Sequence, residues 1–143
     1  MWGFAGSSFD CFVGLPYRDK GRGEQVDCWG LVVRVFSELR GIALPSYTDS
    51  YITADDRVAL AALIGGELDP WDEIAPGDEQ TFDCVLMKEA GYPRHIGVVT
   101  QPGMLLHVQR GETSCIERYR HGALRHRVVG FYRYREMRDG GRA

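Results

Sequence analysis

Hydrophobic positions recur at helical spacing in one segment that begins near residue 28. Its apolar residues follow the i, i+3, i+4, i+7 pattern of one face of an amphipathic helix and stand at positions 31, 32, 35, 36 and 39. Asp27 is a favourable N-cap residue for this segment, and Gly41 is a favourable stop. The pattern therefore predicts a helix from Cys28 to Arg40.

The remaining pattern predicts one more helix and then a series of strands. The second helix is expected from Ala54 to Ile64, before Gly65-Gly66, and the punctuated stretch 69–78 is expected to be loop. Strand-like apolar segments follow, with turn residues between neighbours, at 82–87, 95–100, 104–109, 113–118 and 128–134. Helices first and an antiparallel meander second indicate the α+β class.

Length and composition fit one globular domain covering residues 1–143. The hydrophobic fraction is 44%, which is ordinary for a protein with a packed core. The chain has no run of about 18 apolar residues, so we expect no membrane span. The start, Met1 to Phe4, lacks a basic region followed by an apolar one, so we expect synthesis in the cytoplasm without a signal peptide.

Charge is distributed unevenly along the chain. From Ile116 onward, eight arginines stand against three acidic residues, which gives +5, and the net charge of −3 leaves −8 for residues 1–115. These arginines alternate with aliphatic and aromatic residues, which is typical of a half-buried strand with a solvated face. We therefore expect this segment to dock onto a protein partner or a carboxylate-rich substrate, and we expect no direct binding of nucleic acid.

The four cysteines stand at positions 11, 28, 84 and 115. No pair has the Cys-x-x-Cys or Cys/His spacing of a zinc site, so the sequence predicts no metal and no cofactor. The even count allows two disulfides, but without a secretory signal we expect reduced thiols. Cys84 and Cys115 lie in strand-like segments and are expected to be small buried residues.

Cys28 differs from the other cysteines because it opens the predicted helix. The unpaired amides and positive dipole end of a helix N-terminus favour an anion, so a thiolate is stabilised there. With a cationic neighbour, the thiol pKa falls from about 8.5 into a range of roughly 3.5–7.5. The backbone N–H of Cys28 is also a candidate donor to a developing oxyanion. The alternative is that Cys28 is a core residue on the inner face of the helix.

Two histidines complete a candidate constellation. His95 opens one predicted strand and His107 lies on the next, so a short hairpin brings them together on one sheet face. A cysteine, a base and a group that orients the base are what a thiol nucleophile needs. Each histidine alone is also compatible with a structural role, and a metal site from His95, His107 and a carboxylate lacks supporting ligand spacing. His121 and His126 lie in an arginine-rich loop and are expected at the surface.

Three ordered motifs resemble the NlpC family of cell-wall cysteine peptidases. The first block is Gly14-Leu15-Pro16-Tyr17 followed by Val26-Asp27-Cys28-Trp29-Gly30-Leu31-Val32. The second and third are Arg94-His95-Ile96-Gly97-Val98-Val99 and Leu105-Leu106-His107-Val108. The resemblance runs over about residues 12–134, which is nearly the whole chain.

This resemblance implies a papain-like fold in which the nucleophile opens a helix packed against an antiparallel sheet. Cys28 would attack the scissile carbonyl, and His95 would take the thiol proton and later protonate the leaving amine. His107 would orient His95. Tyr17 matches a tyrosine that helps polarise the oxyanion or contacts substrate, although a packed loop aromatic is the equal alternative. Asp27 would serve first as the N-cap and secondarily as a contact for a substrate amine.

The family usually cleaves between D-glutamate, through its γ-carboxyl, and a diamino acid in peptidoglycan stem peptides. The resemblance therefore implies a peptidoglycan peptide as substrate. The family's serine after the cysteine is replaced here by Trp29, whose bulk would alter the contacts made with substrate.

The carboxy-terminal run Val129-Gly130-Phe131-Tyr132-Arg133 is similar to the endings of small peptidases encoded among phage or gene-transfer-agent tail genes. This implies tail-tip or baseplate proteins as partners, and a place in a virion or tail-like particle that acts in the periplasm or cell wall. Two alternatives stay open because a fold does not fix a reaction. One is a catalytically silent structural tail subunit, and the other is a thiol amidase or acyltransferase acting on another substrate.

Overall fold

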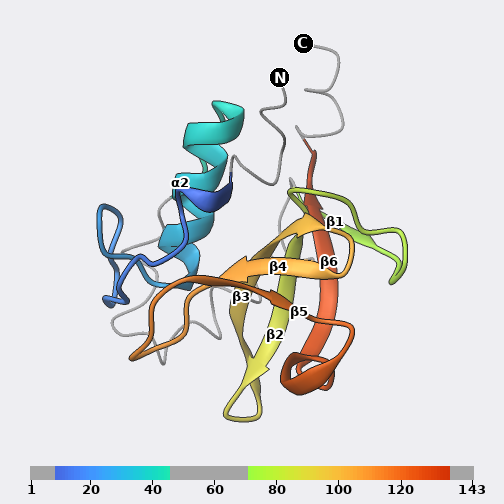
Figure 1. Ribbon diagram of the computed structural model, residues 1–143. Helices are drawn as coiled ribbons and strands as arrows, with labels where there is room; N and C mark the ends of the chain where they lie inside the picture. Colours follow the sequence, from blue (N-terminus) through green and yellow to red (C-terminus); the bar gives the residue numbers. More distant parts are fainter. Residues whose placement is uncertain (1–8, 46–70, 136–143) are drawn as a thin grey trace.

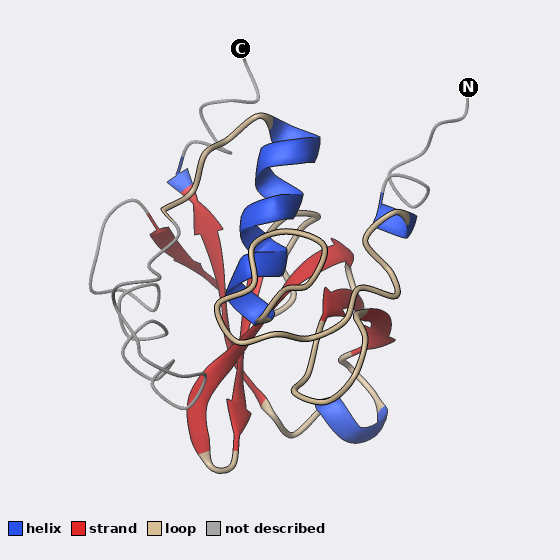
Figure 2. Cartoon of the chain, turned by 90° about the vertical axis from the view of Figure 1, so that its left-hand side faces the viewer, coloured by secondary structure: helices blue, strands red, loops and turns tan. Residues whose placement is uncertain are grey.

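Helix α2 lies against one face of an antiparallel sheet in the computed structural model, which describes residues 9–45 and 71–135 (Figures 1 and 2). Helix α2 spans Cys28–Arg40 and packs on β3. The strands are β1 (Trp71–Ile74), β2 (Cys84–Glu89), β3 (Tyr92–Gln101), β4 (Met104–His107), β5 (Cys115–Arg118) and β6 (Val128–Tyr134), with the short helix η3 (Gly122–Leu124) before β6. The predicted α+β class is confirmed, and the predicted helix 54–64 lies outside the described residues.

Both ends of α2 fall where the capping residues predict. Asp27 is extended, and its side chain accepts a hydrogen bond from the Gly30 amide at 2.7 Å. Gly41 adopts a left-handed conformation with φ 65°, which lets its amide bond back to the carbonyls of Phe36 and Ser37. No helix in the described part of the chain is long and apolar enough to cross a membrane.

The strand order is β1-β6-β2-β3-β4-β5, and every pairing is antiparallel. Strands β2 to β5 form the predicted meander. Strand β6 departs from it, because it crosses back to pair with β2 instead of following β5. This crossover places β6, the last strand of the described residues, between β1 and β2, where its aromatic residues are buried.

Strand β1 corrects the expectation that residues 69–78 are loop throughout. Trp71 is 6% exposed and packs edge-on against Trp29 and Tyr134. The pairing of Trp71–Ile74 with β6 supplies backbone partners that the local Pro, Asp and Gly signals do not reveal.

Two strand boundaries also differ from their predictions. Strand β2 begins at Cys84 instead of residue 82, because Phe82 has φ 77°, which no strand residue adopts. Strand β3 begins at Tyr92, so His95 lies inside a strand and not at its start.

Apolar side chains are buried on both faces of the sheet. The core beside the helix combines the inner face of α2 with residues of the sheet, among them Cys84, Leu86, Ile96, Val98 and Leu106. The second cluster contains Val85, Met87, Val99, Leu105, Tyr119, Leu124 and Phe131. Cys84 is fully buried as predicted, whereas Cys115 is only partly buried. None of the four cysteines, all of which lie in the described residues, is joined in a disulfide.

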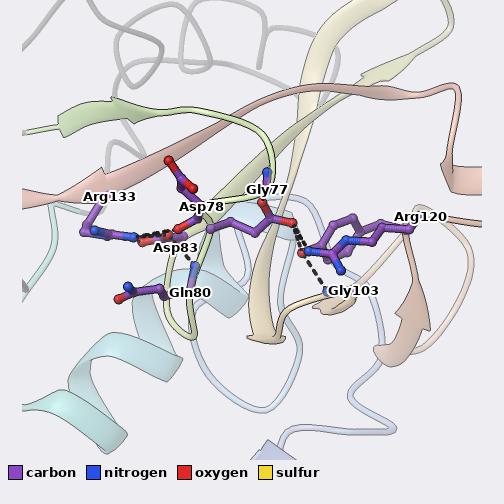
Figure 3. Close-up of polar contacts among 9 residues, drawn as sticks. Gly77, Asp78, Gln80, Asp83, Gly103, Arg120 and Arg133 are labelled. Carbon is purple, nitrogen blue, oxygen red and sulfur yellow. Dashed lines mark hydrogen bonds and ion pairs between the residues drawn. The ribbon is translucent and has the colours of Figure 1, made fainter.

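Several carboxy-terminal arginines pair with acidic residues of the chain itself. Arg133 contacts both carboxylate oxygens of Asp83, at 2.7 and 2.8 Å (Figure 3). Arg120 bonds Glu79 at 2.8 Å, and Arg135 bonds Asp72 at 2.9 Å. These three arginines therefore pair within the chain, and the ion pairs bring acidic and basic segments of the sequence together.

Glu79 is the buried centre of this polar network. Its carboxylate accepts hydrogen bonds from the Tyr119 hydroxyl at 2.6 Å, from Arg120 and from the Gly77 amide (Figure 3). Burial alone would raise the pKa of Glu79, but the hydrogen bonds from Tyr119 and Arg120 outweigh it and lower the pKa from 4.5 to about 2. Burial and the bond to Glu79 raise the pKa of Tyr119 to about 12.

We expect Glu79 to make stability fall in acid. Because its pKa is lower in the folded state, its contribution is complete above pH 4.5 and is lost as pH falls toward 2. The shift corresponds to roughly 3 kcal/mol. Urea unfolding at pH 6 and at pH 3 should show this loss in the wild type and a smaller loss in Glu79→Gln. Asp78→Asn, an exposed neighbour, should keep the wild-type pH dependence; an unchanged dependence in Glu79→Gln would contradict the assignment.

Candidate active site

Cys28 is the first residue of α2, and this helix packs against β3, the strand that carries His95. The sequence therefore places the candidate nucleophile and the candidate base on two elements in direct contact. Cys28 is 1% exposed, so its side chain is almost fully covered. The first turn of α2 contains no acidic residue that would oppose a thiolate.

The N-cap of α2 is held by a buried ion pair. The Asp27 carboxylate is fully buried and accepts from the Gly30 amide, from Arg22 at 2.9 Å and from the Lys20 amide at 3.1 Å. The Arg22 guanidinium balances a negative charge that would otherwise lie one residue from the thiol. These contacts fix the start of the helix and occupy the carboxylate, which makes Asp27 a structural cap.

Gly30 is required where this loop meets the helix. A Cβ at Gly30 would lie 2.0 Å from the Gly21 carbonyl oxygen, which is backbone. We expect Gly30→Ala to destabilise the protein by about 1–3 kcal/mol, because overpacking outweighs the better helix propensity of alanine. Gly23→Ala is the matched control, since a Cβ there has nothing within 4 Å. Thermal unfolding of both variants decides the matter, and equal melting temperatures would refute this account.

His95, His107 and Glu117 form a continuous hydrogen-bonded row across three strands. Nε2 of His95 lies 2.8 Å from Nδ1 of His107, and Nε2 of His107 lies 2.9 Å from Oε1 of Glu117. Both histidines are buried, at 1% and 0% exposure, whereas the Glu117 side chain is 38% exposed. The predicted proximity of His95 and His107 is confirmed.

The row assigns a tautomer to each ring. A carboxylate only accepts hydrogen bonds, so Nε2 of His107 carries the proton and donates it to Glu117. Nδ1 of a neutral His107 then has a lone pair and accepts from Nε2–H of His95. Burial lowers the pKa of His107, against the opposing effect of Glu117, and so favours this neutral form. Because Nε2 of His95 carries the proton of that ring, its Nδ1 has the lone pair that can accept a proton.

Gly97 allows the two histidine strands to approach. A Cβ at Gly97 would lie 3.0 Å from the Leu106 carbonyl oxygen and 3.2 Å from Cβ of His107. The glycine two residues after His95 is thus explained by the close packing of β3 against β4.

Segment 14–18 links the start of α2 to β5. On one side, Gly14 and Tyr17 donate backbone bonds to Ser114 and Glu112, just before β5. On the other side, the amide of Arg18 donates to Val26, two residues before Cys28. Tyr17 itself is partly buried, and its hydroxyl donates to Asp19 at 2.8 Å.

Trp29, His121 and His126 were also considered from the sequence, and none of them belongs to the histidine row. Trp29 is fully buried, and its Nε1 donates to the Pro45 carbonyl at 2.9 Å. This places the indole in the core and not on a surface that faces substrate. His121 and His126 are exposed, as predicted.

Glu117 was not identified from the sequence as part of the site. The register of β4 against β5 pairs His107 with Cys115 and Leu105 with Glu117, so alternate residues of β5 share the side of His107. Alternation within the predicted strand 113–118 puts Cys115 and Glu117 on one face, but it does not say which residues of β4 lie opposite.

The comparisons with known proteins agree with this geometry. Residues 14–133 match the NlpC/P60 family, and the chain belongs to that family. The NlpC/P60 domain of the peptidoglycan hydrolase SagA superposes with a TM-score of 0.61 at 16% identity, covering 89% of this chain and 93% of the other. No curated protein matches the chain.

Two longer proteins contain the same fold. A lipoprotein-like NLP/P60 family protein from Staphylococcus aureus has a TM-score of 0.62 at 18% identity, and 92% of this chain is covered. An NlpC/P60 family protein from Bacillus cereus has a TM-score of 0.66, also at 18% identity and 92% coverage. The present chain spans 40% of the length of each. At these identities the likeness establishes the fold.

Proposed function

We propose that this protein is a cysteine peptidase that hydrolyses peptide bonds in peptidoglycan stem peptides. The observation that carries the proposal is the 2.8 Å contact between Nε2 of His95 and Nδ1 of His107. His95 lies on β3, the strand against which the Cys28 helix packs. A thiol nucleophile requires a base that a second group holds in place, and here His107 holds the His95 ring through Nε2. Membership of the NlpC/P60 family and the activity named for SagA support the same substrate.

The proposed reaction follows the protonation states of the row. Nδ1 of His95 takes the proton of the Cys28 thiol, and the thiolate sulfur attacks the scissile carbonyl carbon. The backbone N–H of Cys28 donates to the oxyanion at the positive end of α2. Collapse breaks the C–N bond, and His95 returns the proton to the leaving amine. Water, deprotonated by His95, then cleaves the thioester and regenerates the thiol.

We propose the bond between the γ-carboxyl of D-glutamate and the diamino acid as the one cleaved. Among the residues proposed to contact substrate, Tyr17 is the candidate that the fold leaves partly exposed. Its backbone is tied to Glu112 next to β5 and its segment to Val26 next to the nucleophile. Tyr17 therefore lies on the connection between the two halves of the site.

Glu117→Ala should lower kcat on the order of 10-fold with little change in KM, because the group lost sets a tautomer and does not contact substrate. Glu117→Gln is the matched variant, since its amide oxygen still accepts from Nε2–H of His107 and should preserve most of kcat. Steady-state kinetics on a soluble stem peptide measure both. Equal losses in the two variants would show that charge, and not hydrogen-bond acceptance, matters at this position.

Digestion of purified peptidoglycan followed by mass spectrometry of the released fragments tests the proposal. Fragments that end at γ-D-glutamate would establish the activity and the bond. Cleavage elsewhere in the stem peptide would support the proposed peptidase activity but would show that a different bond is cleaved. No release of fragments, with the protein folded by circular dichroism, would overturn the proposed activity of the isolated chain.

We propose a phage or gene-transfer-agent tail as the setting in which the protein works. Support comes from the sequence similarity of segment 129–133 to endings of tail-encoded peptidases. These residues form part of β6, where Phe131 and Tyr132 are buried, so the similarity concerns the sheet and not a docking surface. Mass spectrometry of purified tail particles from the source organism tests this setting, and absence of the chain from such particles would exclude it.

A further inference from the structure

Three potential metal ligands, His107, Cys115 and Glu117, lie close together on β4 and the edge strand β5. His107 on β4 lies opposite Cys115 on β5, and Glu117 follows two residues later on the same side. One nitrogen of His107, the Cys115 sulfur and a carboxylate oxygen of Glu117 all lie within 4.8 Å of one another. A nitrogen, a thiolate and a carboxylate form a ligand set that suits Zn²⁺, with water in the fourth position.

We propose that His107, Cys115 and Glu117 bind Zn²⁺, and that the bound ion switches off His95 as a base. The binding site stands on its own geometry, whereas the effect on catalysis rests on the proposed cysteine-peptidase function. The site lies on the side of His107 that faces away from His95, so the ion would act without touching the nucleophile.

The distances between the ligand atoms suit a tetrahedral ion after small side-chain movements. Nε2 of His107 and Oε1 of Glu117 are 2.9 Å apart, and Sγ of Cys115 is 4.0 Å from the same oxygen. Ligand atoms around tetrahedral Zn²⁺ are separated by roughly 3.3–3.6 Å, given the usual bond lengths. Partial exposure of Cys115 and Glu117 on the edge strand β5 gives the ion a route from solvent.

The charges around the cluster favour a cation at the thiol. The carboxylates of Glu117 and Glu112 both act electrostatically on Cys115. Arg127 is the positive group that acts on His107, and its guanidinium is already bonded to Gln109 and to the Lys88 carbonyl.

Binding of the ion reverses the protons of the histidine row. Zn²⁺ binds Nε2 of His107, so the proton of that ring moves from Nε2 to Nδ1. Nδ1–H of His107 then donates a hydrogen bond to Nε2 of His95. His95 then carries its own proton on Nδ1 and has no lone pair there to receive the Cys28 proton. Both rings stay neutral, and the single proton released to solvent is that of the Cys115 thiol.

Cobalt(II) substitution tests the site without any substrate. In Cys28→Ala, which removes the catalytic thiol, Co²⁺ should give the near-ultraviolet charge-transfer band of a thiolate ligand. The band should persist in Cys28→Ala/Cys11→Ser, because Cys11 is an exposed cysteine outside the cluster, and should vanish in Cys28→Ala/Cys115→Ser. Absence of the band in Cys28→Ala, or its survival without Cys115, overturns the site.

Two measurements test the switch. Zn²⁺ should inhibit wild-type hydrolysis of peptidoglycan reversibly with EDTA, and Cys115→Ser should keep basal activity but need on the order of 10-fold more Zn²⁺. Nitrogen-15 NMR of Cys28→Ala should show the proton of His95 moving from Nε2 to Nδ1 when Zn²⁺ is added. Equal inhibition of wild type and Cys115→Ser, or an unchanged His95 tautomer, refutes the switch. If the metal-free enzyme is inactive, the proposed function fails, while the cobalt and NMR results still decide the site and the switch.

Discussion

Cys28→Ala is expected to abolish hydrolysis while the fold remains intact. Removal of a covalent nucleophile lowers kcat by about 10⁴-fold or more, because no other group in the site can form the thioester. The structural cost is small, since alanine is the best helix former and the variant loses one buried sulfur atom, a change of about 1 kcal/mol. Fragment release from peptidoglycan gives the rate, and thermal unfolding gives the stability.

Cys84→Ala is the matched control for this prediction. Cys84 is also a fully buried cysteine in the core beside α2, but it lies on β2 in the sheet and not at the helix N-terminus. Its replacement should cost similar stability and leave turnover unchanged. Retained turnover in Cys28→Ala would refute the nucleophile, and an equal loss of turnover in Cys84→Ala would mean that core packing, and not thiol chemistry, had been measured.

Local signals in the sequence account for the part of the site that could be predicted. Asp27 and Gly41 each act on backbone groups within a few residues, so they fix both ends of α2 without reference to the rest of the chain. The proximity of His95 and His107 depends on one tight turn between β3 and β4, and it too is local.

Features that depend on distant segments were missed. Strand β1 exists because Trp71–Ile74 pairs with β6, about 60 residues further along the chain. The role of Glu117 depends on the register of β5 against β4. A one-residue slip in that register would put Glu117 on the opposite face of the sheet from His107.

Trp29 illustrates a signal that was present but outweighed by resemblance. Helical spacing from Trp29 reaches Val32, Val33 and Phe36, which are apolar, so periodicity already favours a core position. Its departure from the family's serine suggested a contact with substrate instead. The structure resolves the conflict in favour of packing, because the indole contacts Trp71 and bonds the Pro45 carbonyl.

Substitution of His95, the proposed base, should lower kcat more than substitution of His107, which orients it. We expect His95→Ala to lower kcat by about 10²–10⁴-fold, the usual contribution of a general base. His107→Ala should be less severe, because His95 keeps its own nitrogen but loses the acceptor that fixes its tautomer. Kinetics on a soluble stem peptide, with kcat and KM reported separately, measure both losses. Exposed His121 and His126 supply control variants, which should keep wild-type rates.

Restoring only the acceptor is the sharper form of this test. In His107→Asn, the amide oxygen can accept from Nε2–H of His95, so kcat should recover part of the loss seen in His107→Ala. A role in packing alone predicts that His107→Leu recovers as much of kcat, because leucine also fills the cavity but offers no acceptor to His95. Losses of equal size in His95→Ala and His107→Ala would instead indicate that the two rings act as one proton-transfer unit. In that case the tautomer argument, and with it the proposed effect of Zn²⁺ on His95, would have to be abandoned.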